Sequence, residues 1–324
     1  MTTKLTNPLL SVVVPLYNES AGLAVLHDAL EKVLQHATHG EYEIVYCDDG
    51  STDNTSALVR AWHTADSRAK LVVLSRNFGK EIATSAGIHA AHGAAILMID
   101  ADGQHPVELI PEFLAKWQAG SKVVVGVRTN NQKEGLVKRY GSKWFYRLFN
   151  RFTGMKLIPG SSDFRLIDRS VQQEFVRLTE RNRITRGLID WLGYQRDYIE
   201  FTANPRLIGE SGYSFRKLFK LAVDSVISLS ISPLYITAYI GAFVLPLSVL
   251  LGLGMVINLL FGDPLHLHAT GGAYVMILVL FLVGVLLVSQ GIIGLYLSHI
   301  HTETQNRPLY VIDKAKSLGL DGEV

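Results

Sequence analysis

Two long stretches with no charged residue and no histidine limit what this chain of 324 residues can fold into. One runs from Ser225 to Gly262 and the other from Ala269 to Ser298. About 20 apolar residues cross a bilayer as a helix, so each stretch is long enough for one membrane helix. We therefore predict two transmembrane helices within 231–298, at about 233–261 and 272–298, behind an N-terminal domain over 1–212.

Charge predicts how such a hairpin is oriented. The linker from Gly262 to His268 has no Lys or Arg, whereas both outer flanks carry several. Positive residues stay on the cytoplasmic side, so we expect an integral protein of the plasma or inner membrane, with its N-terminal domain and both termini in the cytoplasm. An amphipathic juxtamembrane segment (213–230) and a cytoplasmic tail (299–324) complete this organisation. Small residues in the first stretch permit close helix packing, which favours a homo-oligomer.

Composition excludes several other classes. The 31 Lys and Arg nearly balance the 29 Asp and Glu, so bulk charge gives no support to nucleic-acid binding. Cys47 is the only cysteine, which makes an intramolecular disulfide impossible.

The N-terminal part alternates apolar strands with helical stretches. Strands are expected at 11–14, 43–47, 70–74, 95–99 and 122–127, and helices near 21–37, 55–67, 81–91 and 107–117. Buried strands separated by helices predict an α/β fold with a mainly parallel, Rossmann-like sheet and helices on both faces. Ligands bind beyond the carboxyl ends of the strands in such sheets.

Acidic residues follow two of these strands. Asp48 and Asp49 end the second strand, and one of them can accept hydrogen bonds from a base or ribose, although a plain capping turn also explains such residues. Asp100, Asp102 and Gln104 follow the fourth strand and offer hard oxygen ligands for Mg²⁺ or Mn²⁺; a solvated loop is the alternative. Lys80 follows the third strand, where it could meet a phosphate or remain a surface lysine.

A basic segment follows the fifth strand. No acid occurs between Glu134 and Asp163, and both basic residues and apolar or aromatic residues recur at every fourth position. Such stripes predict a helix at about 136–152 that lies in the membrane interface. A solvated basic helix packed on the sheet is the alternative.

Taken together, these motifs resemble a known family. Pro15–Glu19, Asp48–Thr55, Asp100–Gln104 and Arg206–Ser211 are similar to the family-2 inverting glycosyltransferases of the GT-A fold. Ser75–Glu81, Asp163–Leu166, Asn306–Pro308 and the two apolar stretches resemble the polyprenyl-phosphate glycosyltransferases within that family. The likeness is greater to the bactoprenol glucosyltransferases than to their cousins, the dolichol-phosphate mannose synthases.

The resemblance implies a role for each group of residues. A nucleotide-sugar would be bound by Pro15, Tyr17, Asn18, Glu19, Asp48, Asp49, Lys80, Asp100, Ala101, Arg206 and Ser211. Mg²⁺ or Mn²⁺ would be bound by Asp100, Asp102 and Gln104, and the acceptor phosphate by Arg128, Lys138, Arg139 and Ser142. The catalytic residues would be Asp163, Asp102 and Arg165.

The family places a catalytic base at Asp163. A phosphate monoester has a second pKa near roughly 6, so it needs less help from a base than an alcohol does. We therefore expect Asp163 mainly to orient Arg165 and the acceptor phosphate.

The resemblance also implies the reaction. We expect transfer of one sugar, glucose from UDP-glucose, to polyprenyl (undecaprenyl) phosphate on the cytoplasmic leaflet, with inversion, for glycan modification outside the cytoplasm. Another nucleotide-sugar, carrying mannose, an aminosugar or a uronic acid, is the first alternative. A processive polysaccharide synthase is less consistent, because the chain has no Q-x-x-R-W sequence. A non-catalytic membrane protein that binds lipid phosphate would not need the acidic clusters.

Overall fold

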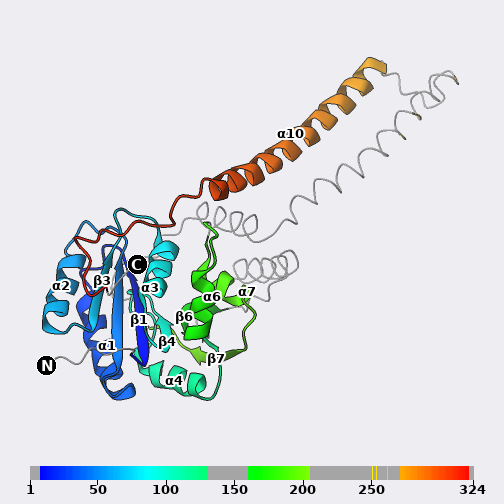
Figure 1. Cartoon of the computed structure of the whole chain (residues 1–324). Coiled ribbons are helices and arrows are strands. Elements are labelled where there is room, and N and C mark those ends of the chain that lie inside the picture. The colour runs from blue at the N-terminus through cyan, green and yellow to red at the C-terminus, as the bar shows by residue number, and fades with distance from the viewer. Residues whose placement is uncertain are drawn as a thin grey trace. The chain divides into compact units, whose positions relative to one another are not determined.

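The structure is a computed structural model that describes residues 8–129, 160–181, 183–204, 250, 253, 261 and 271–320. The chain divides into two compact units. The first comprises 1–150, 155–212 and 307–324, and the second comprises 151–154 and 213–306. In the first unit the described residues form an α/β domain (Figure 1). In the second they include one long helix, α10 (Gly271–Thr304).

A seven-stranded sheet with the order β3-β2-β1-β4-β6-β5-β7 forms the centre of the α/β domain. Its strands are β1 (Leu10–Leu16), β2 (Tyr42–Asp48), β3 (Ala69–Val73), β4 (Ala95–Met98), β5 (Val123–Arg128), β6 (Ser161–Asp168) and β7 (Arg196–Phe201). The first four are parallel to one another, β6 runs antiparallel to β4 and β5, and β7 is parallel to β5. The predicted mainly parallel sheet is confirmed, and the antiparallel β6 is an addition to it.

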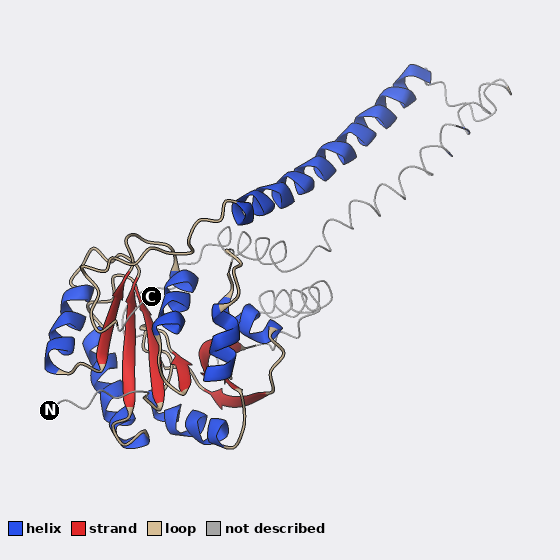
Figure 2. Ribbon diagram, in the orientation of Figure 1, coloured by secondary structure: helices blue, strands red, loops and turns tan. Residues whose placement is uncertain are grey.

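Helices cover both faces of the sheet, as expected (Figures 1 and 2). One face carries α1 (Leu23–Ala37), α2 (Thr55–Ala65), the 3₁₀ turn η1 (Val107–Leu109) and α4 (Ile110–Gln118). The other face carries α3 (Lys80–Ala90), α6 (Arg169–Val176) and α7 (Thr185–Trp191). Successive β1 residues point to opposite faces, so Val12 belongs to the first core and Val13 to the second.

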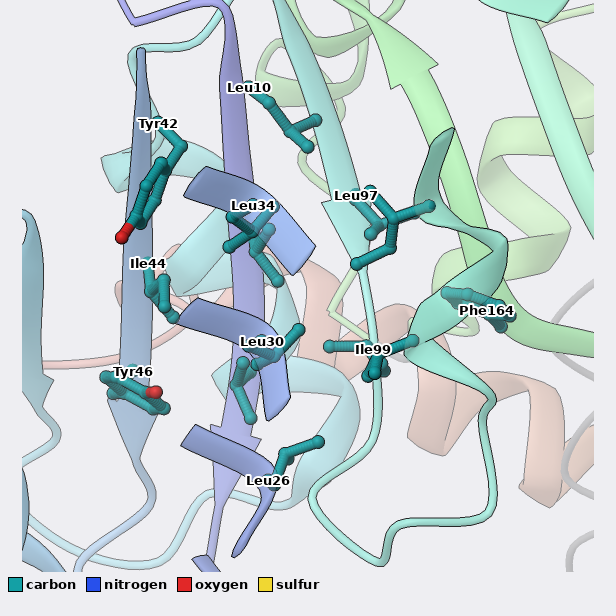
Figure 3. Close-up of a cluster of buried hydrophobic side chains, with 14 of the residues drawn as sticks. Leu10, Leu26, Leu30, Leu34, Tyr42, Ile44, Tyr46, Leu97, Ile99 and Phe164 are labelled. Atoms are coloured by element: carbon teal, nitrogen blue, oxygen red, sulfur yellow. The ribbon is translucent and has the colours of Figure 1, made fainter. Parts of the chain in front are cut away.

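The first core shows why α1 forms and where it lies. Its buried leucines recur three or four positions apart, which gives one apolar stripe on the helix: Leu23, Leu26, Leu30 and Leu34. Figure 3 shows three of them beside Tyr46 and Ile44 of β2. Each fully buried leucine contributes about 1.5–3 kcal/mol, so this stripe fixes α1 against the sheet.

Small side chains bring α3 very close to the sheet on the opposite face. A Cβ atom at Gly87 would overlap with Val13 and lie 2.8 Å from the sulfur of Cys47. This close packing holds α3, whose first residue is Lys80, against β1 and β2.

The segment 307–320 lies along the free edge of β3 rather than forming a separate tail. Leu71 and Leu318 exchange two backbone hydrogen bonds of 3.1 and 2.8 Å, and the N–H of Asp313 donates to the carbonyl of Val73 at 2.8 Å. Tyr310 is also hydrogen-bonded to His89 of α3, at 2.7 Å from its Nδ1. These contacts make the segment part of the α/β domain.

The predicted membrane segments are described only in part. The expected second span, 272–298, falls within α10, while the first span lies almost wholly outside the described residues. The interfacial helix (136–152) and the juxtamembrane segment (213–230) also lie outside them. In the part of the chain that the structure describes, no helix meets the length and apolarity that a membrane crossing requires. The transmembrane hairpin therefore stays a prediction.

Candidate active site

The loops that follow β1 and β2 are joined by hydrogen bonds. Asn18 adopts a left-handed conformation (φ 56°), and its side-chain oxygen accepts from the N–H of Thr52 at 2.9 Å. In return, the N–H of Asn18 donates to Ser51 Oγ at 2.9 Å, and the N–H of Ser20 donates to Asp53 at 3.2 Å. The loops after β1 and β2, which carry several of the residues expected to bind a nucleotide, therefore form one preformed edge of the sheet.

The two aspartates at the end of β2 accept hydrogen bonds from different loops. Asp48 accepts from the N–H of Ser51 at 2.8 Å and so shapes its own loop. Asp49 accepts from the N–H groups of Phe78 and Gly79, at 2.7 and 2.8 Å. Burial raises the pKa of Asp49 and outweighs these two hydrogen bonds, which lower it. Because both its oxygens hold the loop before α3, Asp49 acts here as an anchor for the start of that helix.

Lys80, the first residue of α3, joins two predicted site residues. Its Nζ lies 2.7 Å from one oxygen of Asp100 and 2.8 Å from the other, and 2.9 Å from Asp163 Oδ2. Burial lowers the pKa of Lys80, but Asp100 and Asp163 outweigh that effect and raise it. A single ammonium group thus holds together a carboxylate that follows β4 and one that lies on β6.

The pKa of Asp163 reflects the same pair. Burial favours the neutral acid, but Lys80 and then the Arg186 guanidinium hold the pKa of Asp163 at about 2. Asp163 is therefore a carboxylate throughout the physiological range.

Alternation along β6 decides which side chains reach the site. Asp163 and Arg165 share one face of the strand, and Phe164 enters the core on the other. Arg165 is 1% exposed and pairs with Asp190 at 3.2 Å. Asp163 and Arg165 affect each other's pKa, although their hydrogen bonds among the described residues go to other partners, so the expected orientation of Arg165 by Asp163 stays a prediction.

The loop 100–105 holds the predicted metal ligands. The N–H of Gln104 donates to Asp102 Oδ1 at 3.1 Å, and the N–H of Asp100 donates to His105 Nδ1 at 3.2 Å. His105 is buried and stacks on Phe164, with ring centroids 5.1 Å apart, which fixes the end of the loop. Burial lowers the pKa of His105, consistent with a neutral ring that accepts a hydrogen bond.

The donor set of this loop suits a hard divalent ion. Within the described ranges, no group of three or more His, Cys, Asp or Glu side chains is arranged to hold a metal. Mg²⁺ binds in many enzymes through one or two carboxylates and completes its shell with water and substrate phosphates. The loop therefore offers ligands of the type that Mg²⁺ needs from a protein: Asp100, Asp102 and the amide oxygen of Gln104. An ion on Asp100 would compete with Lys80 for that carboxylate.

A pocket opens at this edge of the sheet. It is lined by Pro15, Lys80, Glu81, Thr84, Met98, Ile99, Asp100, Asp163, Arg165, Thr185 and Arg186. The sequence predicts five of the lining residues as donor-binding or catalytic: Pro15, Lys80, Asp100, Asp163 and Arg165. The sequence does not predict Thr185 and Arg186 of α7, since nothing in their local sequence distinguishes them from an ordinary helix start.

Comparison with known proteins identifies the family. Residues 11–175 match the model of glycosyl transferase family 2. The chain belongs to this family. An uncharacterized glycosyltransferase of Synechocystis sp. is 39% identical over 94% of each chain. The SfII prophage-derived bactoprenol glucosyl transferase of Shigella flexneri is 37% identical over 94% of this chain and 98% of its own.

A solved structure was also matched. Glucosyl-3-phosphoglycerate synthase from Mycobacterium tuberculosis aligns with 71% of this chain and 82% of its own, with 16% identity and a TM-score of 0.47.

Several predicted residues of this family 2 glycosyltransferase lie away from the pocket or outside the described residues. Arg128 is exposed at the end of β5 and does not line the pocket, and Tyr17 is 48% exposed. Ala101 is buried beside Asp100. The remaining predicted contacts fall outside the described residues: Lys138, Arg139, Ser142, Arg206 and Ser211.

Proposed function

We propose that this glycosyltransferase transfers a single glucose from UDP-glucose to polyprenyl phosphate, with inversion of the anomeric carbon. The observation that carries the proposal is the pairing of Asp100 and Asp163 through Lys80 in a pocket at the carboxyl ends of the strands. This arrangement brings the loop expected to bind the donor diphosphate next to the residue expected to face the acceptor. A transferase needs both in one place.

The sugar and the acceptor are inferred from relatives. The Shigella flexneri relative is named a bactoprenol glucosyl transferase, and the similarity extends over almost its whole length. That extent includes the stretches 225–262 and 269–298, which lack charged residues and suit attachment to a membrane that holds the lipid acceptor. We accordingly propose a membrane protein whose catalytic domain faces the cytoplasm. A homo-oligomer remains a prediction from the small residues of the first stretch.

Asp100, Asp102 and Gln104 would hold Mg²⁺ or Mn²⁺. When bound, such an ion stabilises the negative charge that develops on the leaving diphosphate. Asp48 and Asn18 shape the nucleotide edge through their hydrogen bonds to the loop after β2. Asp163 stays ionised and keeps Lys80 in place beside the reacting groups.

The test is a panel of radiolabelled nucleotide-sugars supplied to the purified full-length chain in lipid nanodiscs with undecaprenyl phosphate. We expect one labelled lipid, formed from UDP-glucose and released as glucose by mild acid. Undecaprenol without its phosphate should give none. Asp102→Ala should abolish the product, while Glu108→Ala, which removes an exposed carboxylate nearby, should not.

Three other outcomes would refute parts of the proposal. Labelling from a different nucleotide-sugar would show that the donor is not UDP-glucose. A long labelled polymer would indicate a processive synthase. Lipid binding without any turnover would indicate a non-catalytic protein.

A further inference from the structure

Three cationic side chains line the pocket, and two of them are already engaged by carboxylates. Lys80 binds Asp100 and Asp163, as described above. Arg165 is buried, pairs with Asp190, and donates to the carbonyl of Arg186 at 3.2 Å. Neither can take up a new anion without giving up a partner.

Arg186 differs from both. It is half-buried, lines the same pocket, and lies close enough to Asp163 to lower the pKa of that carboxyl. No hydrogen bond or ion pair joins its guanidinium to any of the described residues, although its own carbonyl is bonded. A half-buried guanidinium has lost part of its hydration, so it attracts an anion that enters the pocket.

The order of the strands indicates which substrate would supply this anion. From one side to the other, β2 and β1 carry the residues expected to bind the nucleotide, β4 leads to the metal loop, and β6 carries Asp163. Arg186 lies on α7, which packs with α3 and α6 on one face of the sheet. Arg186 lines the pocket together with Asp163. In an inverting displacement the nucleophile approaches from the side opposite the leaving group. A phosphate near Arg186 and Asp163 would therefore belong to the acceptor.

We propose that Arg186 binds the phosphate of the polyprenyl phosphate acceptor and holds it beside Asp163. This inference rests on the proposed function. A guanidinium matches two phosphate oxygens at once, which gives it both strength and direction. It also offsets the repulsion between the acceptor phosphate and the Asp163 carboxylate.

The test compares Arg186→Gln and Arg186→Lys with the full-length wild type in nanodiscs. Loss of a hydrogen bond between charged groups weakens binding about 10- to 100-fold, so Arg186→Gln should raise the apparent KM for undecaprenyl phosphate by that factor. The KM for UDP-glucose should not change. The apparent KM of Arg186→Lys for undecaprenyl phosphate should lie between those of the wild type and Arg186→Gln. Lysine keeps the positive charge but lacks the paired donors of the guanidinium. Arg177→Gln is the matched control, since Arg177 is 75% exposed and pairs only with Glu174 among the described residues.

An equal rise in both KM values, a larger rise for UDP-glucose, or no change would overturn the inference. A binding assay separates this result from failure of the proposed function. If the wild type forms no lipid-linked sugar, its binding of farnesyl phosphate is compared with that of farnesol. A preference for farnesyl phosphate that is lost in Arg186→Gln supports the inference even then. A wild type that binds both compounds equally overturns it.

Discussion

Replacing Asp163 by Asn tests how the site uses this carboxylate. With a pKa of about 2, Asp163 loses its charge only as the pH falls through about 2, well below the ordinary value of about 3.9. A group of such low pKa is a poor base near neutrality. The acceptor phosphate has a second pKa near roughly 6 and is mostly dianionic at pH 7.5. We therefore expect the defect of Asp163→Asn to stay constant between about pH 6.5 and 8.5.

The size of the defect follows from the contact that is lost. A hydrogen bond between charged groups contributes about 1.5–3 kcal/mol. Lys80 and Asp163 are 48% and 31% exposed, so solvent screens their pair and the lower part of this range applies. The expected loss in kcat is then about 10- to 40-fold.

The assay is initial-rate transfer from radiolabelled UDP-glucose to undecaprenyl phosphate, with Asp197→Asn as the control on the far strand β7. If Asp163 acts by holding Lys80, the double variant with Lys80→Gln should lose little more activity than the worse single variant. A defect that disappears at pH 8.5 would show that proton removal is the main role of Asp163. Fully additive losses would show that Lys80 and Asp163 act independently. Either result would refute the reasoning.

Three further predictions concern other parts of the domain. Asp102→Ala should reduce transfer at least about 10²-fold with an unchanged melting temperature, because Asp102 lies in a loop rather than a core; normal turnover with intact metal dependence would exclude it as a ligand. Burial, and to a smaller extent Arg183, lowers the pKa of His89 to about 4 in the folded protein. Below pH 6.5 the unfolded chain therefore binds more protons than the folded one, and the free energy of unfolding should fall by about 1–2 kcal/mol between pH 7.5 and 5. His89→Gln should flatten this dependence in thermal melts and the exposed His36→Gln should not. Leu318→Asp should lower the melting temperature by about 2–8 °C and Val311→Asp, whose side chain is 49% exposed, by much less; equal losses would mean that Leu318 is not anchored.

The parts of the fold that sequence predicts best are those with a local periodic signal. The leucines of α1 and the apolar run of β1 place these elements within two residues of their observed ends. Strand direction has no such signal. β6 reads Ser-Ser-Asp-Phe-Arg-Leu-Ile-Asp, and its alternation is the same whether it runs parallel or antiparallel to β4.

In the site, too, some features have a local sequence signal and others depend on contacts between distant parts of the chain. Acids at strand ends could be recognised because parallel strands bring their carboxyl ends to one edge, and Asp100 and Lys80 do meet there. The partner of Arg165 could not be read in this way. Asp190 is 25 positions away, and only the antiparallel course of β6 and the packing of α7 bring it within 3.2 Å. Arg186 was missed for the same reason.

The bonding of residues 311–318 to β3 has a consequence for how the protein is made. β3 is the edge strand of the sheet, and the residues that cover it are synthesised well after all seven strands. The stretches 225–262 and 269–298 are synthesised between β7 and this segment. Until then the edge of β3 keeps open N–H and C=O groups that another strand could pair with. The nascent domain is thus exposed to misassembly for as long as about 100 further residues take to be translated, roughly 5–20 s at ordinary elongation rates.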